Sequence, residues 1–173
     1  MPAHVVADYA GVTRSVITAW KERGRRDVAE HLAAALARAL DAAVADMASA
    51  GSPAPCAIVP VPSSPAARRW RGEDAWERVV RQAVVHASSS GLSVVRCLRH
   101  TRQPRDQAGL SAVDRRVNLT GALSCVEPPS VPVIIVDDII TSGATLAEAI
   151  RALRAAGVEP PRAAAIAATS RTR

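Results

Sequence analysis

VIIVDDIITSGATL, residues 133–146, joins a block of β-branched residues to two aspartates, a loop rich in hydroxyl groups, and the start of an apolar periodic segment. The branched residues 133–136 predict a buried strand, because such side chains pack well on a pleated surface. Residues 145–156, which are followed by Gly157, predict a helix that ends at a glycine. The stretch therefore predicts a strand that leads through a tight loop into a helix.

The rest of the chain alternates strands and helices in the same way. Further strands are expected at residues 56–61, 92–98, 122–126 and 163–168, after a short extended stretch at 1–10. Further helices are expected at 13–23 with Thr13 as N-cap, at 28–48 with Asp27 as N-cap, and at 73–88 and 111–117. This order is typical of a mostly parallel sheet covered by helices on both faces, so we predict an α/β fold.

Residues 99–109 do not fit this alternation. They show no apolar periodicity, they are rich in basic side chains, and Pro104 prevents a regular element across the middle. We therefore expect a long, exposed, cationic loop.

The composition is that of a single soluble globular domain. The chain has 173 residues, of which 49% are hydrophobic and 22% charged. Only 2% are aromatic and Phe is absent, so the core has to be built from Val, Ile, Leu and Ala. We expect residues 1–51 to form an N-terminal helical segment that packs on a core formed by residues 52–173.

The sequence also bears on location and on metal binding by cysteine. No apolar run approaches the roughly 20 residues that span a bilayer, and residues 1–10 lack the features of a signal peptide, so we expect a cytoplasmic protein without a membrane segment. The three cysteines are far apart in the sequence and form no C-x-x-C pair, so we expect small buried apolar residues and not metal ligands: Cys56, Cys97 and Cys125.

The net charge of +6 comes almost entirely from arginine, since Lys21 is the only lysine. The planar guanidinium group suits phosphate and carboxylate oxygens. A polyphosphate ligand, a nucleic acid, and a merely solvated surface are all compatible with this charge. Composition alone does not choose among them.

The loop 141–145 has the features of a phosphate-binding site. Ligands of open α/β sheets lie at the carboxyl ends of strands, where loops lead into helix N-termini. Here the hydroxyls of Thr141, Ser142 and Thr145, together with backbone N–H groups that include that of Ala144, stand at the start of a helix whose dipole favours an anion. Gly143 allows the backbone to turn sharply and approach a ligand.

Asp137 and Asp138 directly precede this loop. Two carboxylates can accept hydrogen bonds from a pair of ribose hydroxyls, or meet them through Mg²⁺. A sugar phosphate would satisfy both the loop and the acids, whereas the loop lacks the Walker A and G-x-G-x-x-G patterns. The alternative is that the two acids and the loop are only a strand end and a helix cap.

With these features the chain resembles the type I phosphoribosyltransferases, whose signature is a hydrophobic strand, two acids, two apolar residues and T-[ST]-G-x-T. Two further segments narrow the resemblance to the ComF/GntX family: IVPVPSSPAARRWRG at residues 58–72 and LRHTRQPRDQAGLSAVDRRVNLTGAL at residues 98–123. Four earlier residues also fit the family's N-terminal segment: Tyr9, Gly11, Arg14 and Lys21. The resemblance covers nearly the whole chain.

The resemblance implies a type I phosphoribosyltransferase-like fold, phosphoribosyl pyrophosphate as donor, and Mg²⁺ as cofactor. It assigns ribose 5-phosphate binding to Thr141, Ser142, Gly143, Ala144 and Thr145, and catalysis to Asp137, Asp138, Arg99 and Arg102, the two aspartates also meeting the metal. It assigns pyrophosphate binding to Pro62, Ser63, Ser64, Arg71, Arg99, Thr101 and Arg102. It places four residues at the far end of a flexible loop: Gln107, Leu110, Arg115 and Asn118.

The chain departs from family patterns at three places. Glu73, Asp74 and Ala75 stand where many members have Phe-Asn-Gln, and the cysteine-rich zinc ribbon with which many members begin is missing. Thr141 stands where oxopurine-specific relatives place an aspartate, which argues against hypoxanthine or guanine as acceptor. The tryptophans are scattered, so we expect them to pack in the core or on the surface and not to stack a base: Trp20, Trp70 and Trp76.

The sequence thus predicts a Mg²⁺-dependent phosphoribosyltransferase whose acceptor is unassigned. The alternative is a non-catalytic accessory protein of competence or DNA uptake that has the same fold and binds a nucleotide or single-stranded DNA. A scaffold that has lost its ligand is a third reading. The superfamily commonly pairs, so a homodimer is also expected.

Overall fold

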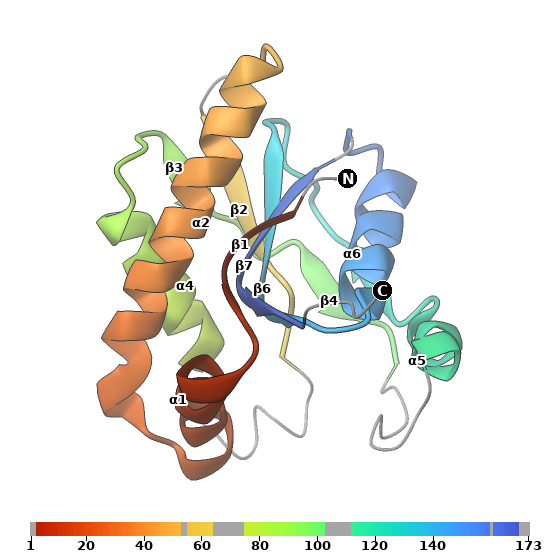
Figure 1. Ribbon diagram of the computed structural model, residues 1–173. Coiled ribbons are helices and arrows are strands. Elements are labelled where there is room, and N and C mark those ends of the chain that lie inside the picture. Colours follow the sequence, from red (N-terminus) through yellow and green to blue (C-terminus); the bar gives the residue numbers. More distant parts are fainter. Residues whose placement is uncertain (1–2, 53–54, 64–74, 103–111, 160, 170–173) are drawn as a thin grey trace.

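A computed structural model describes residues 3–52, 55–63, 75–102, 112–159 and 161–169. Its centre is a five-stranded parallel sheet in the order β1–β7–β6–β2–β3 (Figure 1). The strands are β1 Ala3–Asp8, β2 Cys56–Pro60, β3 Leu92–Val94, β6 Val133–Ile140 and β7 Arg162–Ala168. A separate antiparallel ribbon consists of β4 Leu98–His100 and β5 Leu123–Cys125. The predicted α/β fold with a mostly parallel sheet is confirmed.

Helices cover both faces of this sheet. They are α1 Gly11–Arg23, the 3₁₀ turn η1 Arg26–Val28, α2 Ala29–Ser49, α4 Ala75–His86, α5 Ala112–Leu119 and α6 Ala144–Ala155. Figure 1 shows α2 and α4 on one side of the sheet and α6 on the other, with α1 near the end of the strands at which α6 begins. Within the described ranges, no helix combines the length and the apolar character needed to cross a bilayer.

The alternation of side chains along β6 divides the core into two clusters. Ile134 and Val136 point to the face covered by α1, α2 and α4, whereas Val133 and Ile135 point to α6 and the β4–β5 ribbon. All four side chains are buried, because β6 lies between β2 and β7 and is covered on both faces. On β7, Ala164 and Ala167 are buried in the cluster that contains the α2 side chains, and their small size lets α2 pack close to the sheet. The sheet core therefore fixes β6, and with it the loop that follows.

The N-terminal segment is part of the sheet and not only a helical layer. β1 pairs with β7 along Ala3–Asp8, and the buried face of α2 packs in the same cluster as Ile134 and Val136. The division into residues 1–51 and 52–173 stays a prediction.

Several predicted boundaries are wrong for identifiable reasons. Residues 92–98 do not form one strand: β3 ends at Val94, and the chain crosses to the other cluster, where Cys97 and Leu98 are buried. Arg99 and His100 consequently belong to β4 and not to a loop. Thr13 does not cap α1, whose N-cap is Ala10. Asp27 does not cap α2, because its carboxylate binds Arg25 within the preceding 3₁₀ turn.

Cysteines and tryptophans contribute to packing, as expected. Cys56 and Cys97 are buried and Cys125 is partly buried. Burial, together with the nearby Cys125 thiol, raises the pKa of Cys97 to about 12, so this thiol is an inert core group. Trp20 and Trp76 are buried edge to face, with ring centroids 6.2 Å apart. Trp70 lies outside the described residues.

Candidate functional site

Two of the predicted ligand loops emerge side by side at the carboxyl end of the sheet. β2 and β6 are parallel neighbours, and Pro60 at the end of β2 lies level with Val136. The Val61 N–H donates to the Val136 carbonyl at 2.9 Å, so the chain after β2 stays beside β6. The segment Pro62–Ser63 and the loop after Ile140 therefore lie along one edge of the molecule, as ligand sites of open α/β sheets require.

The loop 141–143 and the first turn of α6 have the geometry of an anion cradle. Gly143 precedes the helix with φ 75°, in the left-handed region that residues with a side chain rarely adopt. The Ala144 N–H lies 3.4 Å from the Ser142 Oγ, and the first turn of α6 contains no acidic residue. On the other side, Thr169 holds the loop through its N–H to the Ile140 carbonyl at 2.9 Å and its Oγ1 to the Thr141 carbonyl at 3.3 Å. The helix N-terminus thus presents positive partial charge without a resident carboxylate.

Asp137 and Asp138 occupy the last half of β6, because this strand runs to Ile140 and not only to Val136 as predicted. Adjacent strand residues point to opposite faces, and Asp138 faces α1, where its Oδ1 lies 2.7 Å from the Lys21 Nζ. The Asp138 N–H donates to the Asp137 Oδ1 at 2.9 Å. The pairing of Lys21 with Asp138 was missed by the sequence analysis, which placed Lys21 only by its family segment.

The two carboxylates have different electrostatic surroundings. Burial and, after it, the charge of Asp138 raise the pKa of Asp137 to about 8, and Lys21 and the Asp138 N–H only partly oppose this. Asp138 has the ammonium of Lys21 within hydrogen-bond distance. Asp137 is therefore largely protonated at neutral pH in the free protein, while Asp138 is held as an ion pair.

Asparagine at position 137 should stabilise the free protein at alkaline pH. Folding raises the pKa of Asp137, so the folded chain binds more protons than the unfolded chain between about pH 4 and pH 8, and stability falls as pH rises through that window. The neutral amide avoids this loss, so we expect D137N to have a free energy of unfolding about 1–3 kcal/mol above wild type at pH 8 and close to wild type at pH 4. Urea unfolding at both pH values checks this, and equal pH slopes for the two proteins would contradict it.

Three of the residues predicted to bind pyrophosphate line one cavity. A cavity of about 250 Å³ lies between the end of β2, the start of α4 and β4, and Pro62, Ser63 and Arg99 are among its lining residues. The His100 Nε2 lies 3.2 Å from the Pro62 carbonyl oxygen and ties β4 to the loop after β2. Ser64 and Arg71, which were also predicted to bind pyrophosphate, lie outside the described residues.

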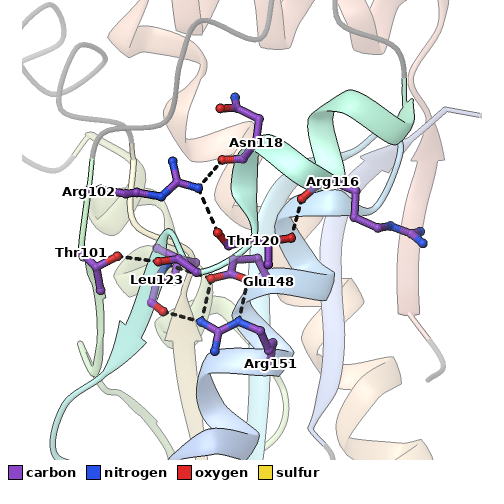
Figure 2. A network of polar contacts seen from close by, with 9 residues as sticks. Thr101, Arg102, Arg116, Asn118, Thr120, Leu123, Glu148 and Arg151 are labelled. Carbon is purple, nitrogen blue, oxygen red and sulfur yellow. Dashed lines mark hydrogen bonds and ion pairs between the residues drawn. The ribbon is translucent and has the colours of Figure 1, made fainter.

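Thr101 and Arg102 connect the start of the predicted flexible loop to residues that follow it. Thr101 binds the far side of this segment through its N–H to the Ala122 carbonyl at 3.0 Å and its Oγ1 to the Gly121 carbonyl at 2.7 Å. The Arg102 Nη2 donates to the carbonyls of Asn118 at 2.7 Å and Thr120 at 2.9 Å, at the C-terminal end of α5 (Figure 2). The predicted contact of Arg102 with pyrophosphate stays a prediction, as do the roles of Gln107 and Leu110, which lie outside the described residues.

Glu148, a buried acid that was not predicted from the sequence, connects α6 to the start of β5. Glu148 is 5% exposed, and its Oε1 accepts the Leu123 N–H at 2.9 Å. Arg151 binds both carboxylate oxygens at 2.8 Å and donates to the Leu123 carbonyl at 2.7 Å (Figure 2). An acid on the otherwise apolar face of α6, with arginine three residues later, is the sequence signal that could have indicated such a pair. The helix that begins at the cradle thereby holds the start of β5.

Asp137 and Asp138 are the candidate ligands for Mg²⁺. In the part of the chain that the structure describes, no three His, Cys, Asp or Glu side chains gather into a metal site. Mg²⁺ usually takes one or two protein carboxylates and completes its shell with waters and phosphate oxygens. Binding of Mg²⁺ by these two residues stays a prediction.

Two comparisons with known proteins agree with this geometry. The family profile described as phosphoribosyl transferase domain matches residues 127–173, which contain β6, the cradle, α6 and β7. Competence protein F of Haemophilus influenzae is 40% identical over 111 residues, which are 61% of this chain and 47% of that protein. The chain thus spans about half the length of this relative. With the parallel sheet and the strand-to-helix loop after β6, these matches support a ComF-like member of the type I phosphoribosyltransferase family.

Proposed function

We propose that the protein is a phosphoribosyltransferase that uses phosphoribosyl pyrophosphate and Mg²⁺ in the cytoplasm, with an acceptor still to be assigned. The observation that carries this proposal is the cradle at the N-terminus of α6, with Gly143 in the left-handed conformation and Asp137 and Asp138 directly before it. The donor carries a 5-phosphate and a ribose diol on the same small sugar. The loop and the acids can therefore bind two parts of one molecule.

The reaction would displace pyrophosphate from the anomeric carbon of the ribose. The backbone N–H groups at the start of α6 hold the 5-phosphate, and the carboxyl oxygens of Asp137 and Asp138 accept hydrogen bonds from ribose hydroxyls. The positive charge of Arg99 stabilises the negative charge on the leaving pyrophosphate. Mg²⁺, when bound to the acid pair and the donor, supplies further charge neutralisation. The bond to the acceptor forms as the bond to pyrophosphate breaks, so positioning and electrostatics are the main tasks of the protein.

Calorimetry with phosphoribosyl pyrophosphate and MgCl₂ tests the proposal by measuring donor affinity. Gly143 and Gly157, which lie at the two ends of α6, provide a matched pair of variants. Gly143 and Gly157 have φ 75° and 81°, and an added Cβ at either meets no atom within 4 Å. G143A and G157A should therefore lose similar stability, about 1 kcal/mol each. Only the Gly143 Cβ would enter the cradle, so G143A should bind the donor at least about 10-fold more weakly than G157A.

The outcomes are distinct. Donor binding by wild type and G157A, with loss in G143A, supports the cradle. Wild-type protein that binds no donor would contradict the proposed function, and equal binding by the two glycine variants would contradict the placement of the phosphate.

A second function is favoured by the name of the relative, competence protein F, and by the net charge of +6. In this alternative, the same fold binds a nucleotide or single-stranded DNA without catalysis. Affinity for a single-stranded oligonucleotide should then fall steeply with salt, because counterions are released from the phosphates on binding. Absent or salt-independent binding would remove this alternative.

A further inference from the structure

The N-terminal segment meets the carboxyl half of β6 through a long-range ion pair. Lys21 in the last turn of α1 donates to Asp138, 117 residues away in sequence, at 2.7 Å. The Lys21 side chain is 30% exposed and that of Asp138 is 15% exposed. The ammonium is therefore partly open to solvent at the edge where the ligand loops emerge.

The position of Lys21 is set by the packing of buried residues that precede it in α1. Ile17 and Trp20 are buried in the core cluster that also contains Ile134 and Val136 of β6. These contacts fix the last turns of α1 against the sheet, so the neighbouring Lys21 is directed to the end of β6. A carboxylate offers about four acceptor positions, so the bond from Lys21 leaves Asp138 able to accept a ribose hydroxyl as well.

We propose that Lys21 is a donor-binding residue: its ammonium, held at Asp138, contributes to binding the anionic phosphoribosyl donor, so that α1 forms a wall of the donor site. This inference rests on the proposed function and extends it to a residue from the N-terminal segment. The cradle lies only three residues beyond Asp138. The flexible four-carbon stem of lysine lets the ammonium stay on Asp138 or turn to a phosphoryl oxygen.

A cation at this place should act in opposite directions on two ligands. It attracts the polyanionic donor, and it repels a divalent metal ion that approaches Asp138 without the donor. A residue that only held α1 in place would weaken both ligands when it was replaced. Opposite changes in donor affinity and metal affinity would therefore indicate a role in binding, and parallel losses would indicate a role in folding.

The experiment measures binding of two probes by K21M. The first is Mn²⁺ alone, an oxygen-seeking substitute for Mg²⁺ that can be followed by water proton relaxation. The second is phosphoribosyl pyrophosphate at saturating MgCl₂, measured by calorimetry. We expect K21M to bind Mn²⁺ about 3-fold more tightly and the donor about 10-fold or more weakly, the size expected for one charge-assisted contact. K21R, which keeps the charge, should stay close to wild type.

R162M is the matched control. Arg162 and Asp46 form a second long-range ion pair, 116 residues apart, but Arg162 is the first residue of β7 and so lies at the opposite end of the parallel sheet. R162M should leave both probes unchanged. Parallel weakening of both probes in K21M, unchanged donor binding, or a K21R as weak as K21M would overturn the inference. If the wild-type protein binds no donor, both the proposed function and this inference are contradicted. If wild type and K21M bind the donor equally well, only this inference is contradicted.

Discussion

Replacement of Glu148 by alanine is expected to lower the free energy of unfolding by about 3–4 kcal/mol, because the change leaves buried polar groups without their partner. The Glu148 carboxylate accepts the Leu123 N–H and both arms of Arg151, and Leu123 is itself only 4% exposed. Water cannot readily reach the buried Leu123 N–H in the E148A protein. For a chain of 173 residues, the loss corresponds to a fall in Tm of about 6–16 °C.

Glutamine at position 148 is the control that separates charge from hydrogen bonding. E148Q keeps an oxygen that can accept the Leu123 N–H, but it loses the ion pair with Arg151, so it should lose about half as much stability as E148A. Thermal and urea unfolding of the three proteins measure the series. An E148A protein as stable as wild type would show that the contact between α6 and β5 is dispensable.

The pH dependence of this effect has a defined sign. Burial alone would raise the pKa of Glu148, but hydrogen bonds from Arg151 and from the backbone N–H groups of Leu123 and Gly121 lower it below the usual value of 4.5. A carboxyl group with a lowered pKa stabilises the folded state above its unfolded pKa, and this contribution is lost as pH falls through the folded pKa. The gap between wild type and E148A should therefore be full near pH 7 and shrink below about pH 4.

The fold and the cradle could be predicted because their signals are local. The block at 133–136 and the helix that follows have the periodicities of a buried strand and an amphipathic helix, and both appear as β6 and α6. The expected glycine conformation at position 143 also follows from its place between strand and helix. These features depend on residues within one turn or one strand of each other.

The features that could not be predicted depend on tertiary contacts. Residues 92–98 look like one strand because their apolar content is continuous, yet the chain leaves the sheet after Val94 so that Cys97 and Leu98 can enter the second cluster. The extension of β6 through Asp137 and Asp138 comes from pairing with β7, as in Asp137 with Ala165. The partner of Asp138 is distant in sequence, and no local pattern indicates that Lys21 reaches it.

Replacement of Asp138 by asparagine is expected to have the largest effect on donor binding, about 100-fold or more, the size of a lost contact of about 2.7–4 kcal/mol with a charged group in a preorganised site. The change removes the negative charge that accepts a ribose hydroxyl and that holds the Lys21 ammonium. It should also weaken Mn²⁺ binding, in contrast to K21M, because here the acid itself is neutralised. Calorimetry and water proton relaxation give the two affinities.

D46N is the control for Asp138, because Asp46 is also an acid in a long-range ion pair, and its partner Arg162 lies at the amino end of the sheet. Both variants lose an ion pair that joins a helix to a strand, and both acids are partly exposed. D46N also loses the contact between Asp46 and the His4 Nε2 at 3.6 Å. Partly exposed pairs contribute little to stability, about 1 kcal/mol or less, so both proteins should stay folded. If loss of a helix-to-strand ion pair were enough to disturb the donor site, D46N would bind the donor as poorly as D138N. Normal donor binding by D46N together with a loss in D138N would instead mean that the acid acts on the ligand directly, and full donor affinity in D138N would show that the ribose does not depend on this carboxylate.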